Sequence, residues 1–242
     1  MKNLLLILLC LPSFTSFGQV LDYDGNDDGC VNIDDALGLL MEFGQCLDVE
    51  VFVCGETIEH QDYDYSTVQI GEQCWFSENC RYLPVVSHSS LGSSTEPYYY
   101  VYGYEGTDLA AAKATENYET YGVLYNWPAV MTEGICPSGW HIPSDGEFTQ
   151  LTDFLGGESV AGGKMKDDVQ WDGSNSSGWT GLPGGYRYSD GFNVSGHGGH
   201  WWSASESGSY SWKRRLLSDY VNVFRNDGSR YYGFSARCVR DD

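Results

Sequence analysis

The chain has 242 residues, a formal net charge of −21 and a pI near 4.3, and 15% of its residues are aromatic. A strongly acidic protein is repelled by nucleic acid and by anionic membrane surfaces, which excludes these two classes of partner. The high aromatic content is not typical of disordered chains, and the length allows one large domain with a small module attached.

The first 18 residues have the features of a cleavable signal peptide. A basic residue, Lys2, precedes an apolar run over residues 4–11, and small residues stand at Ser16 and Gly18. The run is too short to span a bilayer and no later stretch approaches 18 apolar residues, so no membrane insertion is expected. We therefore predict cleavage after Gly18 and a secreted, extracellular or cell-surface location.

Residues 24–35 follow the ligand pattern of an EF-hand-type calcium loop. Oxygen-bearing side chains stand at loop positions 1, 3, 5, 9 and 12, and a glycine stands at position 6. A hard cation needs six or more oxygen ligands, and the glycine allows the chain to turn sharply around it. The predicted ligands of one Ca²⁺ are Asp24, Asn26, Asp28, the backbone carbonyl of Cys30, Asn32 and Asp35. The alternative is an acidic turn that lies in solvent without a metal.

A short helix is predicted directly after this loop, over about residues 33–43. Its apolar residues recur at helical spacing, and Gly44 can end it. Cys30 and Cys46 bracket the helix, and a disulfide between them would stabilise a module as small as residues 19–46.

From Cys54 onward the sequence predicts short strands with long loops between them. Residues 65–70 and 73–76 form a predicted hairpin, with Gly-Glu as its turn. A second predicted hairpin consists of residues 221–225, a turn at 226–229 and residues 230–238. The long, glycine-rich loops are expected over residues 87–98 and 172–199.

One main helix is predicted over residues 144–156. Ser144 and Glu147 form a capping box at its start, and Gly156 can end it. The residues expected on its buried face are Phe148, Leu151 and Leu155. Together with the short strands, this helix predicts an α+β domain.

Six sequence blocks of the main domain resemble one known family. They are 65–79 (YSTVQIGEQCWFSEN), 121–127 (YGVLYNW), 136–145 (CPSGWHIPSD), 182–187 (LPGGYR), 201–205 (WWSAS) and 233–240 (GFSARCVR). In this order they are similar to the Fibrobacter succinogenes major paralogous domain, an abundant bacterial extracellular domain, and the resemblance covers residues 54–242. It implies a C-type-lectin-like fold, which is also similar to that of the formylglycine-generating enzymes. Residues 24–43 resemble one half of a dockerin.

Seven cysteines remain after the predicted cleavage. In an oxidising compartment most of them should form disulfides, and an odd number leaves one thiol free or paired between molecules. The expected pairs are Cys136–Cys238, Cys30–Cys46 and Cys54–Cys74. Cys80 is then the odd thiol.

Two groups of residues could carry catalytic or metal chemistry. His197 and His200 stand three residues apart beside two tryptophans, and the alternative is a glycine loop that precedes an aromatic strand. Cys136 with the nearby His141 could be a thiol nucleophile and its base, and the alternative is a structural disulfide.

Aromatic side chains could bind sugars, because a flat ring stacks on the C–H face of a pyranose. The candidates are Trp171, Trp179, Trp201, Trp202, Trp212 and the run of residues 98–104. The alternative is that most of these rings are buried in the core. The acidic charge argues against acidic polysaccharides, so a neutral glycan or an extracellular protein is the expected partner.

These features favour a secreted, calcium-binding and non-catalytic recognition or surface protein. The alternatives are an extracellular enzyme that acts on polysaccharide or protein, and a structural component of the cell surface. No charged catalytic pair at a recognisable spacing supports the enzyme hypothesis.

Overall fold

The structure, a computed structural model, describes residues 52–189 and 191–241. The chain divides into two units, and the second, Phe52–Asp242, contains everything described below. The predicted signal peptide (1–18), calcium loop (24–35) and following helix (33–43) lie outside the described residues. Within the described ranges, no helix is long and apolar enough to cross a membrane.

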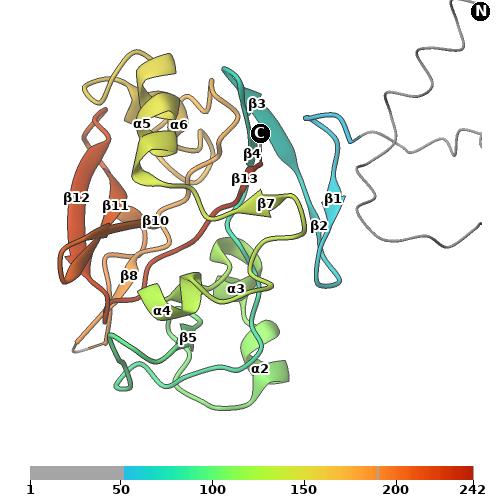
Figure 1. Cartoon of the computed structure of the whole chain (residues 1–242). Helices are drawn as coiled ribbons and strands as arrows, with labels where there is room; N and C mark the ends of the chain where they lie inside the picture. The colour runs from blue at the N-terminus through green and yellow to red at the C-terminus, as the bar shows by residue number, and fades with distance from the viewer. Residues whose placement is uncertain (1–51, 190, 242) are drawn as a thin grey trace, which may run out of the picture. The chain divides into compact units, whose positions relative to one another are not determined.

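The described part combines small sheets with short helices, as predicted for an α+β domain (Figure 1). The helices are α2 (Leu109–Lys113), α3 (Glu116–Tyr121), α4 (Trp127–Val130), α5 (Asp145–Phe154) and α6 (Ala161–Met165). The first strands are β1 (Ile58–Glu59), β2 (Asp64–Tyr65), β3 (Thr67–Ile70), β4 (Gln73–Phe76), β5 (Tyr99–Tyr100), β6 (Leu124–Tyr125) and β7 (Trp140–His141). The later strands are β8 (Tyr186–Tyr188), β9 (Gly191–Asn193), β10 (Gly198–Ser207), β11 (Tyr210–Leu217), β12 (Phe224–Ser229) and β13 (Val239–Arg240).

Two antiparallel sheets organise these strands. One has four strands in the order β3-β4-β13-β7, so the end of the chain pairs with strands from its beginning and middle. The other has three strands in the order β10-β11-β12. In the view of Figure 1, helices α5 and α6 lie together near the top, between β12 and β3, and α2, α3 and α4 lie in the lower part. The pairs β1-β2, β5-β6 and β8-β9 form three small two-stranded sheets.

The first predicted hairpin is confirmed, whereas the second is wrong. Strands β3 and β4 pair across Gly71 and Glu72, as expected. The predicted turn at 226–229 lies instead inside β12, which pairs with β11. Gly228 is buried there, and an added Cβ would lie 3.1 Å from side-chain atoms of Lys213 and Phe234. The Asn-Asp-Gly sequence of residues 226–228 is typical of a turn, but here Gly228 lies within a strand and allows the neighbouring side chains to pack closely against it.

The predicted main helix is confirmed as α5. The Ser144 side chain accepts a hydrogen bond from the Glu147 backbone N–H, and the Glu147 side chain accepts one from the Ser144 backbone N–H. This capping box satisfies backbone donors at the helix start, so the local sequence alone fixes where the helix begins. The apolar face of α5 is buried through Phe148, Leu151 and Leu155.

The hydrophobic core consists of two clusters, and consecutive residues of single strands contribute to both. Trp201 belongs to one cluster and Trp202 to the other, although both stand on β10. Trp75 and Phe76 divide in the same way on β4. Because successive strand residues point to opposite faces, each Trp-Trp or Trp-Phe pair anchors a strand between the two clusters.

Two disulfides connect distant parts of this unit, with the pairings expected from the sequence. They are Cys54–Cys74 and Cys136–Cys238. Cys80 is a buried free thiol. The third expected pair, Cys30–Cys46, lies outside the described residues.

Candidate functional site

The residues proposed from the sequence for catalysis do not form one site. Cys136 is bonded to Cys238, so the disulfide interpretation is confirmed and its sulfur is not a free thiol here. His197 is exposed, whereas His200 on β10 is only 5% exposed. Gly198 and Gly199 belong to β10 as well, so they are not the glycine loop that was the alternative for this motif.

His141 on β7 lies between two carboxylates. Its Nε2 is 2.7 Å from Glu147 Oε1, and its Nδ1 is 2.5 Å from Asp241 Oδ1. Burial acts to lower the pKa of His141, but the hydrogen bonds to Asp241 and Glu147 outweigh it and raise the pKa above 6.5. The ring therefore joins the start of α5 to the end of the chain.

His200 has a different environment, beside a buried lysine. Its Nδ1 lies 3.4 Å from the Lys213 Nζ atom. Burial, with the charges of Lys213 and Arg215, lowers the pKa of His200 well below 6.5. Burial also lowers the pKa of Lys213, to about 8, with a further contribution from Arg215. Within the core, the His200 ring stacks on the Phe234 ring, and the Lys213 Nζ atom also lies over that ring.

Most of the tryptophans proposed for sugar stacking are core residues. Trp179, Trp201 and Trp202 are fully buried. Trp171 and Trp212 are half-buried, and a cation lies over each ring, with Lys166 Nζ at 5.5 Å from the first and Arg225 Cζ at 3.8 Å from the second. In the run of residues 98–104, Tyr99 and Tyr100 are buried. The interpretation of these rings as core anchors is confirmed for the fully buried ones.

Three other tyrosines gather at the surface, and we call Tyr188, Tyr210 and Tyr232 the tyrosine surface. Tyr188 ends β8, Tyr210 begins β11, and Tyr232 follows β12. The rings of Tyr188 and Tyr232 stack with their centroids 4.1 Å apart. Tyr188 is 39% exposed and Tyr210 is 49% exposed. Burial, a hydrogen bond with Tyr188 and the neighbouring tyrosines, Tyr210 among them, raise the pKa of Tyr232 to about 12.

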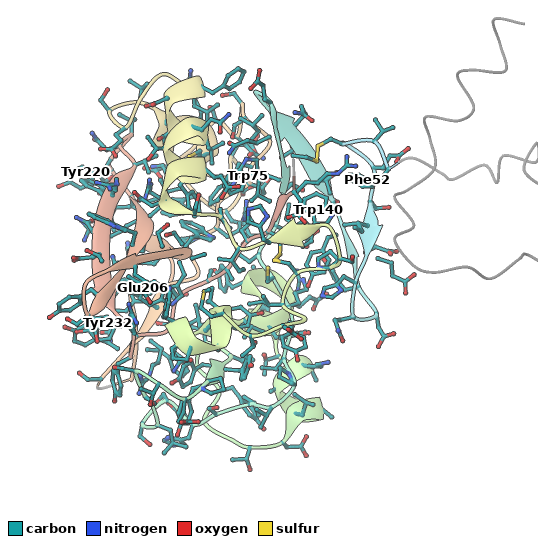
Figure 2. All side chains as sticks on the ribbon, viewed as in Figure 1. Phe52, Trp75, Trp140, Glu206, Tyr220 and Tyr232 are labelled. Atoms are coloured by element: carbon teal, nitrogen blue, oxygen red, sulfur yellow. A yellow bond between two sulfur atoms is a disulfide. The ribbon has the colours of Figure 1, made fainter. Side chains whose placement is uncertain are left out.

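Charged groups border the tyrosine surface. The Arg230 guanidinium donates to the backbone carbonyls of Gly208 and Tyr210, and its Nη2 lies 3.1 Å from Glu206 Oε1. The Glu206 side chain remains 63% exposed. Figure 2 labels Tyr232 and Glu206 beside the sheet of β10 to β12. An exposed carboxylate thus lies next to partly exposed aromatic rings, which together can contact the hydroxyl groups and the C–H face of a sugar.

A separate cleft of about 430 Å³ lies beside β7. Its lining is mostly apolar and includes Met131, Ile135, Cys136, Trp140, His141 and Ile142. Cys136 is half-buried and is the part of the Cys136–Cys238 disulfide that lines this cleft. The cleft and the tyrosine surface share no lining residue.

Sequence reasoning missed the tyrosine surface. The Tyr-Arg-Tyr pattern of residues 186–188 could have indicated two rings on one face of a strand. No local pattern brings Tyr210 to Tyr232, however, because their proximity depends on the pairing of β11 with β12. The predicted metal ligands Asp24, Asn26, Asp28, Cys30, Asn32 and Asp35 lie outside the described residues.

Comparison with known proteins identifies the family of the main domain. A family model described as the Fibrobacter succinogenes major domain matches residues 68–240, and the chain belongs to this family. No solved structure and no curated protein matched the chain.

Proposed function

We propose that this member of the Fibrobacter succinogenes major domain family is an exported, non-catalytic recognition protein that binds a neutral glycan through its tyrosine surface. The two disulfides support export, because such bonds persist in oxidising compartments. The signal-peptide pattern of residues 1–18 supports it independently.

The observation that carries the proposal is the exposure of Tyr188 and Tyr210 next to Tyr232. Three segments of the chain deliver these rings to one place, and the stacking of Tyr188 on Tyr232 holds both in a fixed orientation. Rigid, partly exposed aromatic rings bind ligands with a small loss of conformational entropy. Glu206 adds a carboxylate that can accept hydrogen bonds from sugar hydroxyls.

Charge favours a neutral ligand over an acidic one. The chain has a net charge of −21. Beside the tyrosine surface, Glu206 is paired with Arg230, and Asp227, which accepts a hydrogen bond from Ser207 on β10, adds a further carboxylate. An anionic polysaccharide would be repelled at this place, whereas a neutral one would not.

A C-type-lectin-like fold forms part of this proposal. Short antiparallel strands, one longer helix, long irregular segments and a disulfide to the residue just before the last strand support it. The sequence resemblance of residues 54–242 points in the same direction. An experimental structure with a different strand order would contradict it.

A glycan array tests the proposal. Purified protein should bind neutral oligosaccharides more strongly than chains that contain uronic or sialic acids, and the double substitution Tyr188→Ala/Tyr210→Ala should abolish the signal. Tyr220→Ala is the matched control, because Tyr220 is also exposed, at 52%, but packs on Phe224 outside the tyrosine surface. Absence of any glycan signal would instead favour a structural surface component.

We also propose that residues 24–35 bind one Ca²⁺ and stabilise the N-terminal module. Carboxylate, amide and carbonyl oxygens at this spacing match the hard ligands that Ca²⁺ prefers. Calorimetric titration of the exported chain should give an affinity of about 10⁻⁶ to 10⁻³ M, and Asp24→Ala/Asp28→Ala should remove the heat. Failure to detect heat at millimolar calcium would contradict the proposal.

A further inference from the structure

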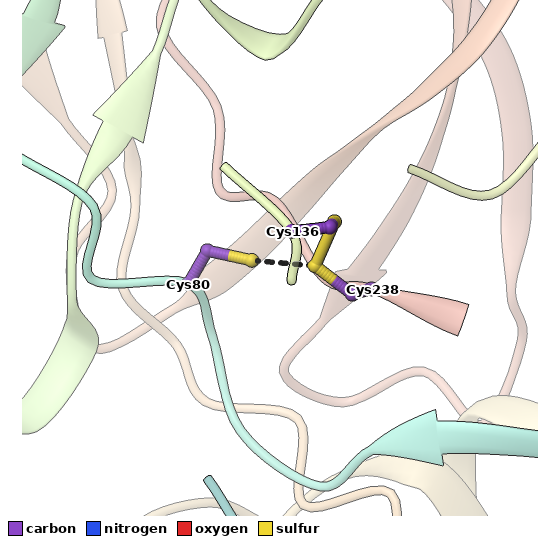
Figure 3. Close-up of side chains that lie close together, drawn as sticks. All are labelled: Cys80, Cys136 and Cys238. Atoms are coloured by element: carbon purple, nitrogen blue, oxygen red, sulfur yellow. Dashed lines mark hydrogen bonds between the residues drawn. A yellow bond between two sulfur atoms is a disulfide. The ribbon is translucent and has the colours of Figure 1, made fainter. Parts of the chain in front are cut away.

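Three cysteine sulfurs meet in the interior of the main domain. Cys80 Sγ lies 3.5 Å from Cys238 Sγ, and the sulfurs of Cys80, Cys136 and Cys238 all lie within 4.8 Å of one another (Figure 3). Cys238 is bonded to Cys136, and Cys80 is a free thiol. A thiol in contact with a disulfide sulfur is the arrangement from which thiol–disulfide exchange starts.

Backbone hydrogen bonds hold Cys80 and Cys238 in place. The Cys80 N–H donates to the Ala236 carbonyl at 2.9 Å, and the Phe76 N–H donates to the Cys238 carbonyl at 3.0 Å. The Val123 N–H donates to the Cys80 carbonyl at 3.2 Å. These bonds hold both main chains in this part of the core. The three sulfurs are not in line, since all lie within 4.8 Å of one another, so the Cys80 side chain must rotate to align its sulfur with the S–S bond.

The three cysteines differ in their access to solvent. Cys80 and Cys238 are fully buried. Cys136 is half-buried and lines the apolar cleft of about 430 Å³ beside β7. The free thiol is therefore hidden when it resides on Cys80 and would be accessible if it resided on Cys136.

We infer that Cys80 exchanges with Cys136 as the partner of Cys238, which transfers the free thiol from the core to the cleft. The Cys80 thiolate attacks Cys238 Sγ, the Cys80–Cys238 bond forms and the Cys136–Cys238 bond breaks. The electron pair leaves on Cys136 Sγ, which takes up a proton to replace the one that Cys80 released. One thiol and one disulfide are present before and after the exchange, so no external oxidant or reductant is needed.

The surroundings of Cys80 make this exchange slow at neutral pH. Burial raises the pKa of Cys80 to about 12, against an opposing effect of the Arg237 charge. The other ionisable groups that interact with this thiol are Glu78, Tyr65 and Tyr125. Only the thiolate attacks a disulfide. At pH values below this pKa, the thiolate fraction increases about tenfold for each unit by which the pH rises.

The cleft then becomes a modification site for small disulfide compounds. A Cys136 thiolate can attack an oxidised low-molecular-weight thiol, forming a mixed disulfide and releasing one thiol of the compound. The apolar lining of the cleft, with Trp140 and Ile142, would favour a compound with an apolar group. This site is independent of the glycan-binding proposal, because it shares no residue with the tyrosine surface.

Alkylation of the native, full-length chain tests the inference. The protein is incubated without denaturant in excess iodoacetamide at pH 7 and pH 9, and its cysteine peptides are mapped under non-reducing conditions. We expect the label on Cys136 together with a Cys80–Cys238 cross-link. The labelling rate should rise about 100-fold between the two pH values and should not depend on iodoacetamide concentration at high excess, because exchange is the limiting step.

Two variants serve as controls. Cys80→Ala and Cys80→Leu both lack the attacking thiol, so Cys136 should stay unlabelled in whichever of them retains the wild-type circular dichroism spectrum. The inference is overturned if the label appears on Cys80 while Cys136–Cys238 remains intact. It is equally overturned if native wild-type protein at pH 9 stays unlabelled while denatured protein is labelled at Cys80 alone.

Discussion

One buried arginine, Arg237, is held by amide and aromatic contacts. Arg237 is fully buried, and its guanidinium donates to Asn79 Oδ1 at 2.9 Å and to the Trp179 carbonyl. Its Cζ lies 3.7 Å from the centre of the Trp179 ring. Burial lowers the pKa of Arg237 to about 9, against the opposing effects of Cys80 and Glu78. Asn79 is therefore a central acceptor in this part of the core.

Replacement of Asn79 should cost more stability than the size of the side chain suggests. Its Oδ1 also accepts from Trp201 Nε1 at 2.8 Å, so Asn79→Leu would leave two buried donors without this acceptor. We expect a loss of about 3 kcal/mol in the free energy of unfolding, measured by urea denaturation. Ser235→Ala is the control, because it removes only a 3.4 Å contact with Asn79 and should cost far less. Equal losses for both variants would contradict this account.

His141 should give the stability a pH dependence of predictable sign. The pKa of His141 is raised in the folded state, so its contribution is fully present below the unfolded value near 6.5 and is lost as pH rises through the folded value. The pKa of Glu147 is lowered: burial raises it, and hydrogen bonds from Ser144 and His141 outweigh that effect. The contribution of Glu147 is accordingly lost as pH falls below its unfolded value near 4.5, through the folded one.

The expected result is that His141→Gln destabilises the domain most at about pH 5–6, between these two limits. The difference from wild type should shrink as pH rises through the folded pKa of His141, which NMR titration of the imidazole can measure. A difference that grows with rising pH would contradict the assignment of a charged imidazole between Glu147 and Asp241.

At the scale of elements, two short-range signals were predictive, whereas the Asn-Asp-Gly turn signal at residues 226–228 was not. Helix α5 and the β3-β4 hairpin were predictable because capping residues and a tight turn act within a few positions of the chain. Strand β11 was not predicted; it contains Lys213, Arg214 and Arg215, a basic run that is typical of solvent-exposed segments. In the structure Arg214 is 1% exposed and pairs with Asp145 at 2.6 Å. That partner stands 69 residues earlier in the chain, so no local pattern could reveal it.

Helix α6 offers a paired test of its packing. An added Cβ at Gly162 would lie 2.3 Å from the Asn222 carbonyl oxygen, whereas one at Gly163 would meet only Val221, with its Cγ1 atom nearest, at 3.3 Å. Both changes to alanine raise helix propensity equally, so propensity cancels in the comparison. Gly162→Ala should therefore destabilise the domain by about 1–3 kcal/mol more than Gly163→Ala, measured by thermal unfolding. A smaller cost for Gly162→Ala would show that α6 does not approach residue 222 this closely.

At the scale of the whole molecule, part of the positive charge is buried in the main domain. The chain has 13 Lys and Arg residues against 34 Asp and Glu, and Arg187, Arg214 and Arg237 are all at most 1% exposed. Because these three arginines are buried, they neutralise less of the surface acidity than their number suggests. This distribution underlies the expectation that a ligand of the main domain is neutral.

The candidate site illustrates what composition predicts and what it does not. An excess of aromatic residues predicted aromatic contacts, but the named tryptophans are largely core residues, and the exposed rings belong to tyrosines on β8, β11 and the segment after β12. Exposure is decided by sheet pairing over long sequence distances, which a single sequence does not reveal. The Cys136–Cys238 pair was predicted correctly although its two cysteines stand 102 positions apart.

Calorimetric titration of the tyrosine surface tests the central claim most directly. The neutral oligosaccharide with the strongest array signal is titrated into wild type, Tyr188→Ala, Tyr210→Ala and the control Tyr220→Ala. Loss of one stacking ring should weaken binding by about 1 kcal/mol, or roughly fivefold, for each variant of the tyrosine surface, with no change for Tyr220→Ala. Unchanged affinity in Tyr188→Ala and Tyr210→Ala, with both proteins folded, would contradict the assignment of glycan binding to this surface.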